Sequence, residues 1–389
     1  MSGRRLSRAP LAGLGASLLL LLLLAAGAPA PALAGPASGS PAVVAMGDSY
    51  ISGEAGRWQG NSIDPLPGND GTDRACVPGG LLCLADKNRV YVGGSAADGC
   101  HRSDISEVVS ARPVGGDPVN IACSGAVTAN ILRAQSGGVG QDGEPPQADQ
   151  LLPIARARDV RTIVLSIGGN DLGFAGIVTA CFEAYLLHQG PCQPAQQQAL
   201  AQRVPAATLG VERAIDEIRA VMAQDGYRTS DYRLVAQTYP SVVPRAAEAR
   251  YAEADPRRVI DGCPFYDQDL NWARDVAAPE IGAVVRAAAH ARGVEVLDLR
   301  DALAGHEICA RADREATVLS RPAPAQSEWG RFVGANTILE GDLQEAFHPN
   351  AYAQLALGAC LARLLVVAPG DHACHGAAGR SPDGMVLTG

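Results

Sequence analysis

The 389-residue sequence contains a single lysine, Lys87, and its aromatic residues amount to only 4% of the chain. Acidic residues outnumber basic ones by 41 to 32, which gives a formal net charge of −9. A chain of this charge has no electrostatic reason to bind nucleic acid or an anionic membrane surface. Because 47% of the residues are hydrophobic, the chain can still bury a sizeable core, which excludes wholesale disorder.

Two short motifs that would indicate other chemistries are also missing. No Gly-x-Ser-x-Gly segment occurs, which argues against the serine turn of α/β-hydrolases. No Cys-x-x-Cys pair occurs either, and the cluster Asp371–His375 stands alone, whereas structural zinc needs four well-spaced ligands. We therefore expect no metal site.

Residues 1–34 have the pattern of a secretory signal peptide. Three arginines lie in the first ten positions, an apolar run (Leu18–Leu24) follows, and Ala32–Ala34 gives a small-x-small cleavage pattern. The uncharged stretch from Ala9 to Ala34 is also long enough to span a bilayer, so an uncleaved anchor is the competing interpretation. We predict cleavage and secretion, with residues 35–41 as a flexible spacer and no stable membrane insertion afterwards.

The rest of the chain carries ten cysteines, an even number that is typical of disulfide pairing in an exported protein. Ten cysteines allow many pairings, so their spacing alone does not fix the connectivity. Pairing each cysteine with its neighbour along the chain is the most economical arrangement. It gives the bonds Cys76–Cys83, Cys100–Cys123, Cys181–Cys192, Cys263–Cys309 and Cys360–Cys374.

Five short runs rich in β-branched residues, separated by helical patterns, predict one α/β domain over residues 42–375. Alternation of strands and helices indicates a central parallel sheet with helices on both faces. The expected strands are residues 42–46, 119–122, 162–167, 232–237 and 294–299. The expected helices are residues 125–134, 211–224, 270–291 and 349–367.

Long insertions rich in glycine, proline and polar residues interrupt this pattern. Each contains at least one cysteine, so we expect disulfide-tied surface loops at residues 54–100, 171–205, 239–269 and 303–347. The end of the chain, residues 376–389, shows no periodicity and predicts a disordered tail.

Four polar motifs stand at the ends of the predicted elements. Gly47–Tyr50 follows the first strand, Cys123–Ala126 the second and Gly168–Asp171 the third, while Glu345–Asn350 precedes the last helix. Ligands of open α/β sheets bind outside the carboxyl ends of the strands. With the strand order 2-1-3-4-5, the commonest small doubly wound order, the first three motifs lie side by side.

These motifs hold the groups that acyl transfer by a serine nucleophile requires. Ser49 lies on a tight strand-to-helix turn, and His348 would take the proton of its hydroxyl. The N–H groups of Ser49 and Gly125 and the side-chain amide of Asn170 would stabilise the oxyanion. Glu345, three residues before His348, is placed to orient the imidazole as the third catalytic residue.

The segments GDSY, CSGA, GGND and ExxHP resemble, in this order, the motif blocks of the SGNH (GDSL) hydrolases, and especially the secreted actinobacterial lipases and esterases. The resemblance covers residues 42–367. It implies a flavodoxin-like three-layer α/β/α fold with about five strands and hydrolysis of carboxylic esters through an acyl-enzyme without a cofactor. The roles that it implies for Ser49, Gly125, Asn170 and His348 are those given above. It also implies the pairs Cys100–Cys123, Cys181–Cys192 and Cys263–Cys309, which leaves the pairs 76–83 and 360–374.

One position departs from the family pattern, because Glu345 stands where aspartate is usual. The extra methylene could carry the carboxylate off the ring, and some relatives use a backbone carbonyl instead; Asp342 is a distant second candidate. Ser124 stands beside an expected disulfide, and Asp48 stands in the turn before Ser49. We interpret both as structural residues. Trp329 and Phe347 could shape an acyl pocket, although a buried aromatic belongs more often to the core.

The substrate is expected to be a lipid or small acyl ester, because aromatic platforms for glycans are scarce in this composition. The alternatives are a polysaccharide O-deacetylase or a phospholipase acting at the same site, or a catalytically silent extracellular binding module. We expect a monomer.

Overall fold

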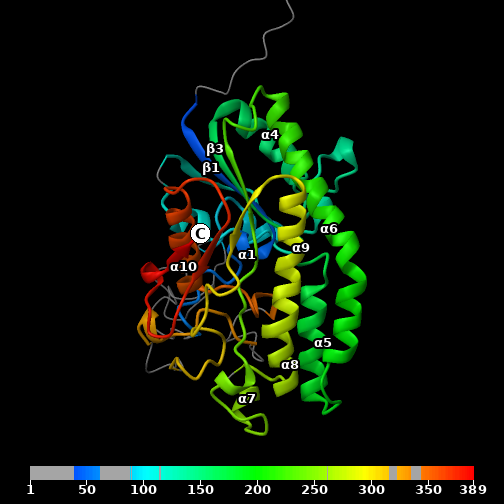
Figure 1. Ribbon diagram of the computed structural model, residues 1–389, viewed down its shortest axis with the longest axis vertical. Coiled ribbons are helices and arrows are strands. Elements are labelled where there is room, and N and C mark those ends of the chain that lie inside the picture. Colours follow the sequence, from blue (N-terminus) through cyan, green and yellow to red (C-terminus); the bar gives the residue numbers. More distant parts are fainter. Residues whose placement is uncertain are drawn as a thin grey trace, which may run out of the picture. The chain divides into compact units, whose positions relative to one another are not determined.

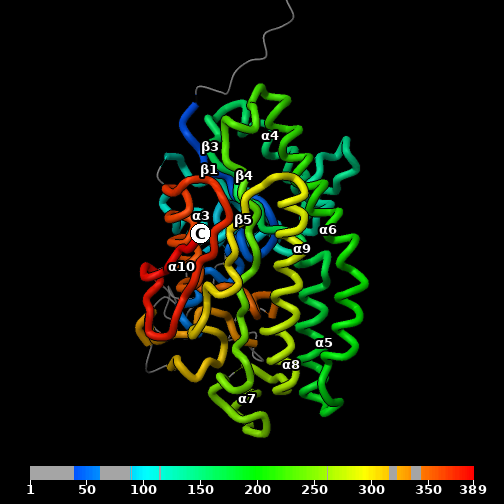
Figure 2. The backbone as a smooth tube through the Cα atoms, in the orientation of Figure 1, coloured from blue at the N-terminus to red at the C-terminus, as the bar shows by residue number. Residues whose placement is uncertain are grey.

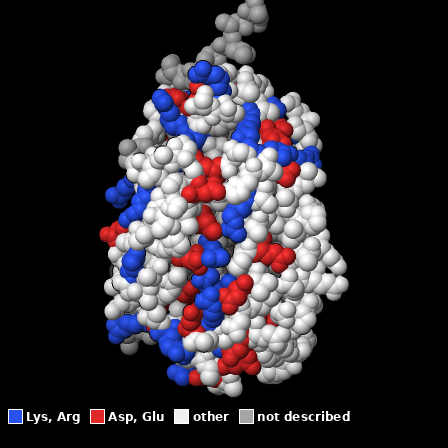
Figure 3. All heavy atoms as spheres, viewed as in Figure 1, with Lys and Arg blue, Asp and Glu red and all other residues white. Residues whose placement is uncertain are grey.

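The computed structural model describes residues 39–61, 88, 90–113, 115–260, 262–314, 322–333 and 343–389. The predicted signal segment, the predicted pair Cys76–Cys83 and Asp342 lie outside the described residues. The inferences made for them therefore stay predictions. Among the described residues, no helix is both long and apolar enough to cross a membrane. On the face shown in Figure 3, positive and negative side chains are interspersed.

The sheet has the strand order β2-β1-β3-β4-β5-β6-β7, and the first six strands are parallel. Strands β1 and β3 lie side by side in Figure 1. The first five strands therefore have the order 2-1-3-4-5, which is the condition under which the first three motifs lie side by side. Their bounds are β1 Pro41–Gly47, β2 Asp117–Asn120, β3 Asp159–Ser166, β4 Arg233–Gln237 and β5 Glu295–Asp298.

The C-terminal tail is ordered, so the prediction of disorder over residues 376–389 was wrong. Strand β6 (His372–His375) extends the sheet beside β5, and β7 (Val386–Thr388) pairs with β6 in antiparallel fashion. The Cys360–Cys374 disulfide ties β6 to a helix, and Met385 is buried in the core. Long-range pairing and burial thus order a segment that has no periodicity of its own.

Helices cover both faces of the sheet, because alternate side chains of a strand point to opposite faces. In β1, Ala42, Val44 and Met46 pack on one side, whereas Val43 and Ala45 pack on the other. This gives the three-layer α/β/α arrangement, which the backbone tube in Figure 2 also shows. The first side holds α4 (Gln147–Ala157), α6 (Gln193–Gln224) and α9 (Ala278–Ala291), and the second holds α3 (Glu107–Ser110) and α10 (Ala351–Leu364).

Two further predictions about helices need correction. The segment 171–205, expected as a loop, forms α5 (Phe174–Leu186) and the start of α6, with the Cys181–Cys192 bond beside the turn between them. Its proline at position 194 lies in the first turn of α6, where a missing N–H costs nothing. Residues 125–134, expected as a helix, contain only short 3₁₀ turns, because Gly125 has a left-handed φ of 79° and the Asn130 side chain accepts from the Val127 N–H.

The predicted helix over residues 270–291 is present as a continuous run of three parts. These are α8 (Asp267–Trp272), a π-helical turn (Ala273–Ala277) and α9. Short helices complete the described structure: α1 (Ser49–Ser52), α2 (Ser95–Asp98) and α7 (Arg257–Ile260).

Four of the five predicted disulfides are present in the described residues. They are Cys100–Cys123, Cys181–Cys192, Cys263–Cys309 and Cys360–Cys374. Each closes a loop and so restricts the unfolded chain, an effect of about 2–4 kcal/mol per bond.

Candidate active site

Ser49 is the first residue of α1 and directly follows the turn at the end of β1. Gly47 has a φ of 138°, and a Cβ atom there would lie 1.9 Å from the Ser166 carbonyl oxygen, so only glycine fits. Asp48 caps α1, because its Oδ1 accepts a hydrogen bond of 3.2 Å from the Tyr50 N–H. The turn therefore presents Ser49 at the carboxyl end of the sheet, and the structural interpretation of Asp48 is supported.

The imidazole of His348 reaches the Ser49 hydroxyl. The distance from His348 Nε2 to Ser49 Oγ is 2.7 Å, which is hydrogen-bond range for a general base. The other ring nitrogen, Nδ1, lies 3.1 Å from the Ala346 carbonyl oxygen. An Nδ1–H that donates to this carbonyl leaves Nε2 as the acceptor for the serine proton.

Glu345 does not occupy the position that the sequence predicted for it. Its Oε2 accepts a hydrogen bond of 2.8 Å from the Trp58 indole N–H, and its Oε1 accepts one of 3.4 Å from the Tyr91 hydroxyl. Phe347 has a left-handed φ of 65°, which shapes the turn between Glu345 and His348. The carboxylate thus anchors the loop that carries His348, while the Ala346 carbonyl orients the ring.

Replacing Glu345 with glutamine should therefore lower kcat less than about tenfold. In a triad whose carboxylate orients the histidine, the corresponding amide costs about 10⁴-fold. The glutamine oxygen can still accept from Trp58, so the loop should stay in place. Steady-state kinetics of the purified variant checks this, and a loss near 10⁴-fold would return Glu345 to the role of catalytic acid.

The surroundings of His348 act on its pKa in opposite directions. Burial lowers the pKa, whereas the negative charge of Glu54 and the hydrogen bonds to the carbonyls of residues 345 and 346 raise it; the net effect is a pKa below 6.5. Glu54 is fully buried, and its Oε2 lies 2.9 Å from His101 Nδ1. Burial alone would raise the pKa of Glu54, but the hydrogen bond and charge of His101 outweigh it and keep Glu54 ionised.

The pH dependence of activity should follow from this shift. The base must be neutral to accept a proton, so activity falls as the pH drops through the pKa of His348. Because that pKa lies below 6.5, the acid limb of kcat/KM should have its midpoint below 6.5 as well. A pH–rate profile on a neutral ester checks this, and a midpoint well above 6.5 would contradict it.

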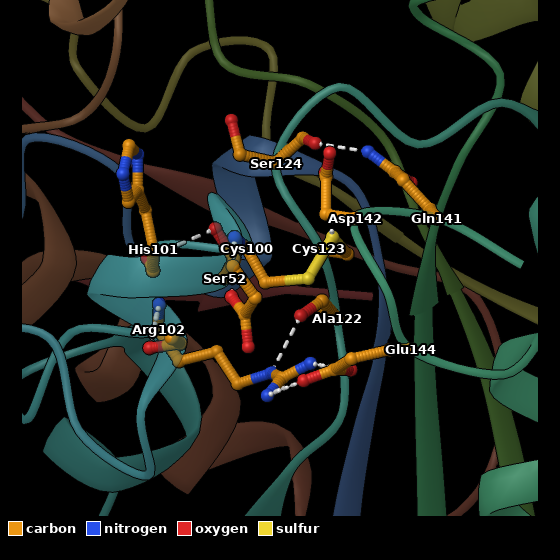
Figure 4. Close-up of a disulfide and its surroundings, with 12 residues drawn as sticks. Ser52, Cys100, His101, Arg102, Ala122, Cys123, Ser124, Gln141, Asp142 and Glu144 are labelled. Carbon is orange, nitrogen blue, oxygen red and sulfur yellow. Dashed lines mark hydrogen bonds and ion pairs between the residues drawn. A yellow bond between two sulfur atoms is a disulfide. The ribbon is translucent and has the colours of Figure 1, made fainter.

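The segment that carries Gly125 is held by the Cys100–Cys123 disulfide (Figure 4). Beside the bond, the Ser124 N–H donates to the Cys100 carbonyl at 3.1 Å. Gly125 has a left-handed φ of 79°, which a residue with a side chain rarely adopts. The disulfide, the hydrogen bond and the glycine together fix the direction of the backbone at position 125.

Asn170 follows β3, and its Nδ2 donates a hydrogen bond of 2.9 Å to the Ala126 carbonyl. An amide nitrogen carries two hydrogens, so a second donor remains. Asn170, Gly125, Ser49 and His348 all line one cavity of about 540 Å³. The structure thus brings together all the predicted reactive groups except the carboxylate of Glu345.

Sequence reasoning missed other residues of the site. Glu54 and His101 belong to no motif, and Gln344 bridges them to the cavity with a bond of 3.1 Å to Glu54 Oε2. The wall formed by α5 was missed as well, although its apolar residues recur every four positions. Trp329 is fully buried and stacks on His306 at 3.9 Å, so it belongs to the core. Phe347 lines a smaller apolar chamber.

Comparison with known proteins identifies the family. Residues 91–356 match the model of the GDSL-like lipase/acylhydrolase family, a match that begins after the turn that carries Ser49. The chain therefore belongs to the GDSL-like lipase/acylhydrolase family, a family of carboxylic ester hydrolases. It is also 29% identical over 194 residues to a lipase of Streptomyces rimosus; this match covers 49% of the chain and 56% of that lipase, little more than half of its length.

Two solved structures resemble the chain more distantly. One is the extracellular lipase of Streptomyces rimosus, with 22% identity, a TM-score of 0.46, and coverage of 83% of this chain and 98% of that one. The other is phospholipase A1 of Streptomyces albidoflavus, with 21% identity, a TM-score of 0.44 and the same coverage.

Proposed function

We propose that this chain is a secreted carboxylic ester hydrolase that forms an acyl-enzyme on Ser49. The observation that carries the proposal is the 2.7 Å contact between His348 Nε2 and Ser49 Oγ at the wall of a cavity of about 540 Å³. A serine hydroxyl becomes a useful nucleophile only when an adjacent base removes its proton. Membership of a lipase/acylhydrolase family supports the same reaction.

The proposed reaction has two halves. Ser49 Oγ attacks the ester carbonyl while His348 takes the hydroxyl proton, and the oxyanion accepts hydrogen bonds from the N–H groups of Ser49 and Gly125 and from Asn170. The imidazolium then donates its proton to the departing alkoxide, which leaves the acyl group on Ser49. In the second half His348 takes a proton from water as the water oxygen attacks the acyl carbonyl. The bond from the acyl carbon to Ser49 Oγ then breaks, the imidazolium returns its proton to Ser49 Oγ, and the carboxylic acid is released.

Export is part of the proposal because of two features of the chain. The first 34 residues carry the basic start, apolar run and small residues of a signal peptide. Four disulfides in the described residues fit an oxidising compartment, since such bonds are rare in the cytosol.

Labelling with a fluorophosphonate tests the assignment of the nucleophile. The wild-type chain should react, and the adduct should map to the peptide that contains Ser49. An adduct on Ser124, which also lines the cavity, would identify Ser124 as the nucleophile in place of Ser49. No adduct on the folded protein would favour the catalytically silent binding module.

A further inference from the structure

The cavity beside Ser49 has one wall made by a single helix, α5, which presents two parallel rows of residues. Residues four apart lie on the same face of a helix. The half-buried row consists of Phe174, Val178 and Phe182, whereas the neighbouring exposed row consists of Ala175, Thr179 and Glu183. The helix therefore offers an apolar surface inside the cavity and a more polar edge at its mouth. From position 174 to 182 the apolar row spans roughly 12 Å.

The other residues that line the cavity indicate which kind of group the apolar row of α5 would bind. Val333, Leu343 and Ala346 add apolar surface, and Ser124 and Gln344 add polar groups. Among the described lining residues, Glu183 is the only carboxylate, and it stands on the exposed row. An uncharged, unbranched hydrocarbon chain suits the apolar row, because burial of each methylene is favourable there.

Behind this wall lies a separate apolar chamber of about 80 Å³. Phe174 and Val178 line both the cavity and the chamber, so they form the partition between them. Phe174 also lines a small pocket of about 40 Å³ that contains Ser49, and its ring packs edge-on against Tyr50 at 5.8 Å. This partition therefore stands beside the carbon that Ser49 would attack.

We propose that the acyl subsite binds one unbranched fatty acyl chain along α5, and that Phe174 is a specificity-determining residue that excludes a branch next to the carbonyl. The inference rests on the proposed function and narrows its substrate class. A branch at that carbon would need the space that Phe174 closes off. Acetyl esters would leave the apolar row empty.

The first experiment compares p-nitrophenyl esters on the wild-type enzyme. The octanoate ester should exceed the acetate ester in kcat/KM by at least tenfold, because burial of only two methylenes, at roughly three- to fourfold each, already gives about tenfold. The kcat/KM of the octanoate ester should exceed that of the valproate ester, its branched isomer, by a factor of about a hundred. Acetate as the best substrate, or equal rates for the two isomers, would overturn the proposal.

The second experiment changes the partition itself. Phe174→Ala should reduce the octanoate-to-valproate ratio at least tenfold, and Phe174→Leu should act in the same direction if the alanine variant does not fold. Phe182→Ala is the matched control, because Phe182 lines the cavity but not the chamber, so it should slow octanoate without helping valproate. Adding Ala278→Leu to Phe174→Ala should refill the space and restore the ratio. An unchanged ratio in folded Phe174 variants would overturn the role of Phe174.

A binding measurement separates this inference from the proposed function. Calorimetry on Ser49→Ala should detect octanoate and give much weaker binding for acetate and valproate. If the wild-type chain hydrolyses no ester but these affinities hold, the proposed function fails and the subsite stands. If esters are hydrolysed but the affinities do not differ, the subsite fails alone.

Discussion

Replacing Ser49 with alanine is expected to lower kcat by about 10⁶-fold, and replacing His348 with alanine should cost about as much. In the proposed mechanism the two side chains act as one unit, because His348 Nε2 lies 2.7 Å from Ser49 Oγ and removes its proton. The double variant should therefore lose no more than either single variant. Steady-state kinetics on a p-nitrophenyl ester, after active-site titration of the wild-type protein, measures all three.

A second serine serves as the matched control for this experiment. Ser136 lies on a 3₁₀ turn and donates a hydrogen bond of 3.0 Å to Glu217, outside the cavity, so Ser136→Ala should keep wild-type kcat. Thermal unfolding of each variant shows whether the fold is retained. Hydrolysis that survives in a folded Ser49→Ala protein would remove Ser49 from the mechanism.

The parts of the fold that could be predicted are those with a strong local signal. A buried strand is typically a continuous apolar run between turn residues. The run at residues 162–167 is of this kind, and the strand predicted there overlaps β3. The three motifs after β1, β2 and β3 could be placed together because neighbouring parallel strands end at the same edge of a sheet. The proximity of Ser49, Gly125 and Asn170 follows from that order.

The parts that were missed depend on contacts with distant segments. Strands β6 and β7 contain four and three residues. Strand β6 is stabilised by pairing with β5 and by the bond to Cys360, and β7 is stabilised by pairing with β6. No local pattern in such short segments distinguishes them from a tail. The position of the Glu345 carboxylate depends in the same way on Trp58 and Tyr91, which come from a different part of the chain.

The electrostatics of the site depend on which group contacts His348 Nδ1, and this group is the Ala346 carbonyl and not the Glu345 carboxylate. A carbonyl at Nδ1 orients the imidazole but carries no full charge, so it stabilises the imidazolium less than a carboxylate would. The negative charge that raises the pKa of His348 belongs to Glu54, which is buried and which the neighbouring His101 and Gln344 keep ionised. Removing that charge by Glu54→Gln should move the acid limb of the pH–rate profile further down, whereas a purely structural role would leave the limb in place.

Replacing Asn170 with alanine is expected to reduce kcat by about 10²–10³-fold with little change in KM, because an oxyanion donor acts mainly on the transition state. One hydrogen of the amide is used by the Ala126 carbonyl, which fixes the side chain at the cavity wall and leaves the other for the substrate. Asn170→Asp should be worse still, since a carboxylate of the same shape would repel the developing negative charge. Asn271→Ala is the control, because Asn271 is exposed and its side chain accepts a hydrogen bond from the Ala246 N–H.

The split between kcat and KM decides what Asn170 does. If Asn170 only held the turn after β3, its loss would lower the thermal midpoint and disturb KM, and Asn170→Asp, which retains the size of the side chain, would be milder than alanine. If it donates to the oxyanion, the aspartate variant is the more damaging of the two at neutral pH. Which of the two variants has the lower kcat therefore separates the two roles, even where both proteins are somewhat less stable than the wild type.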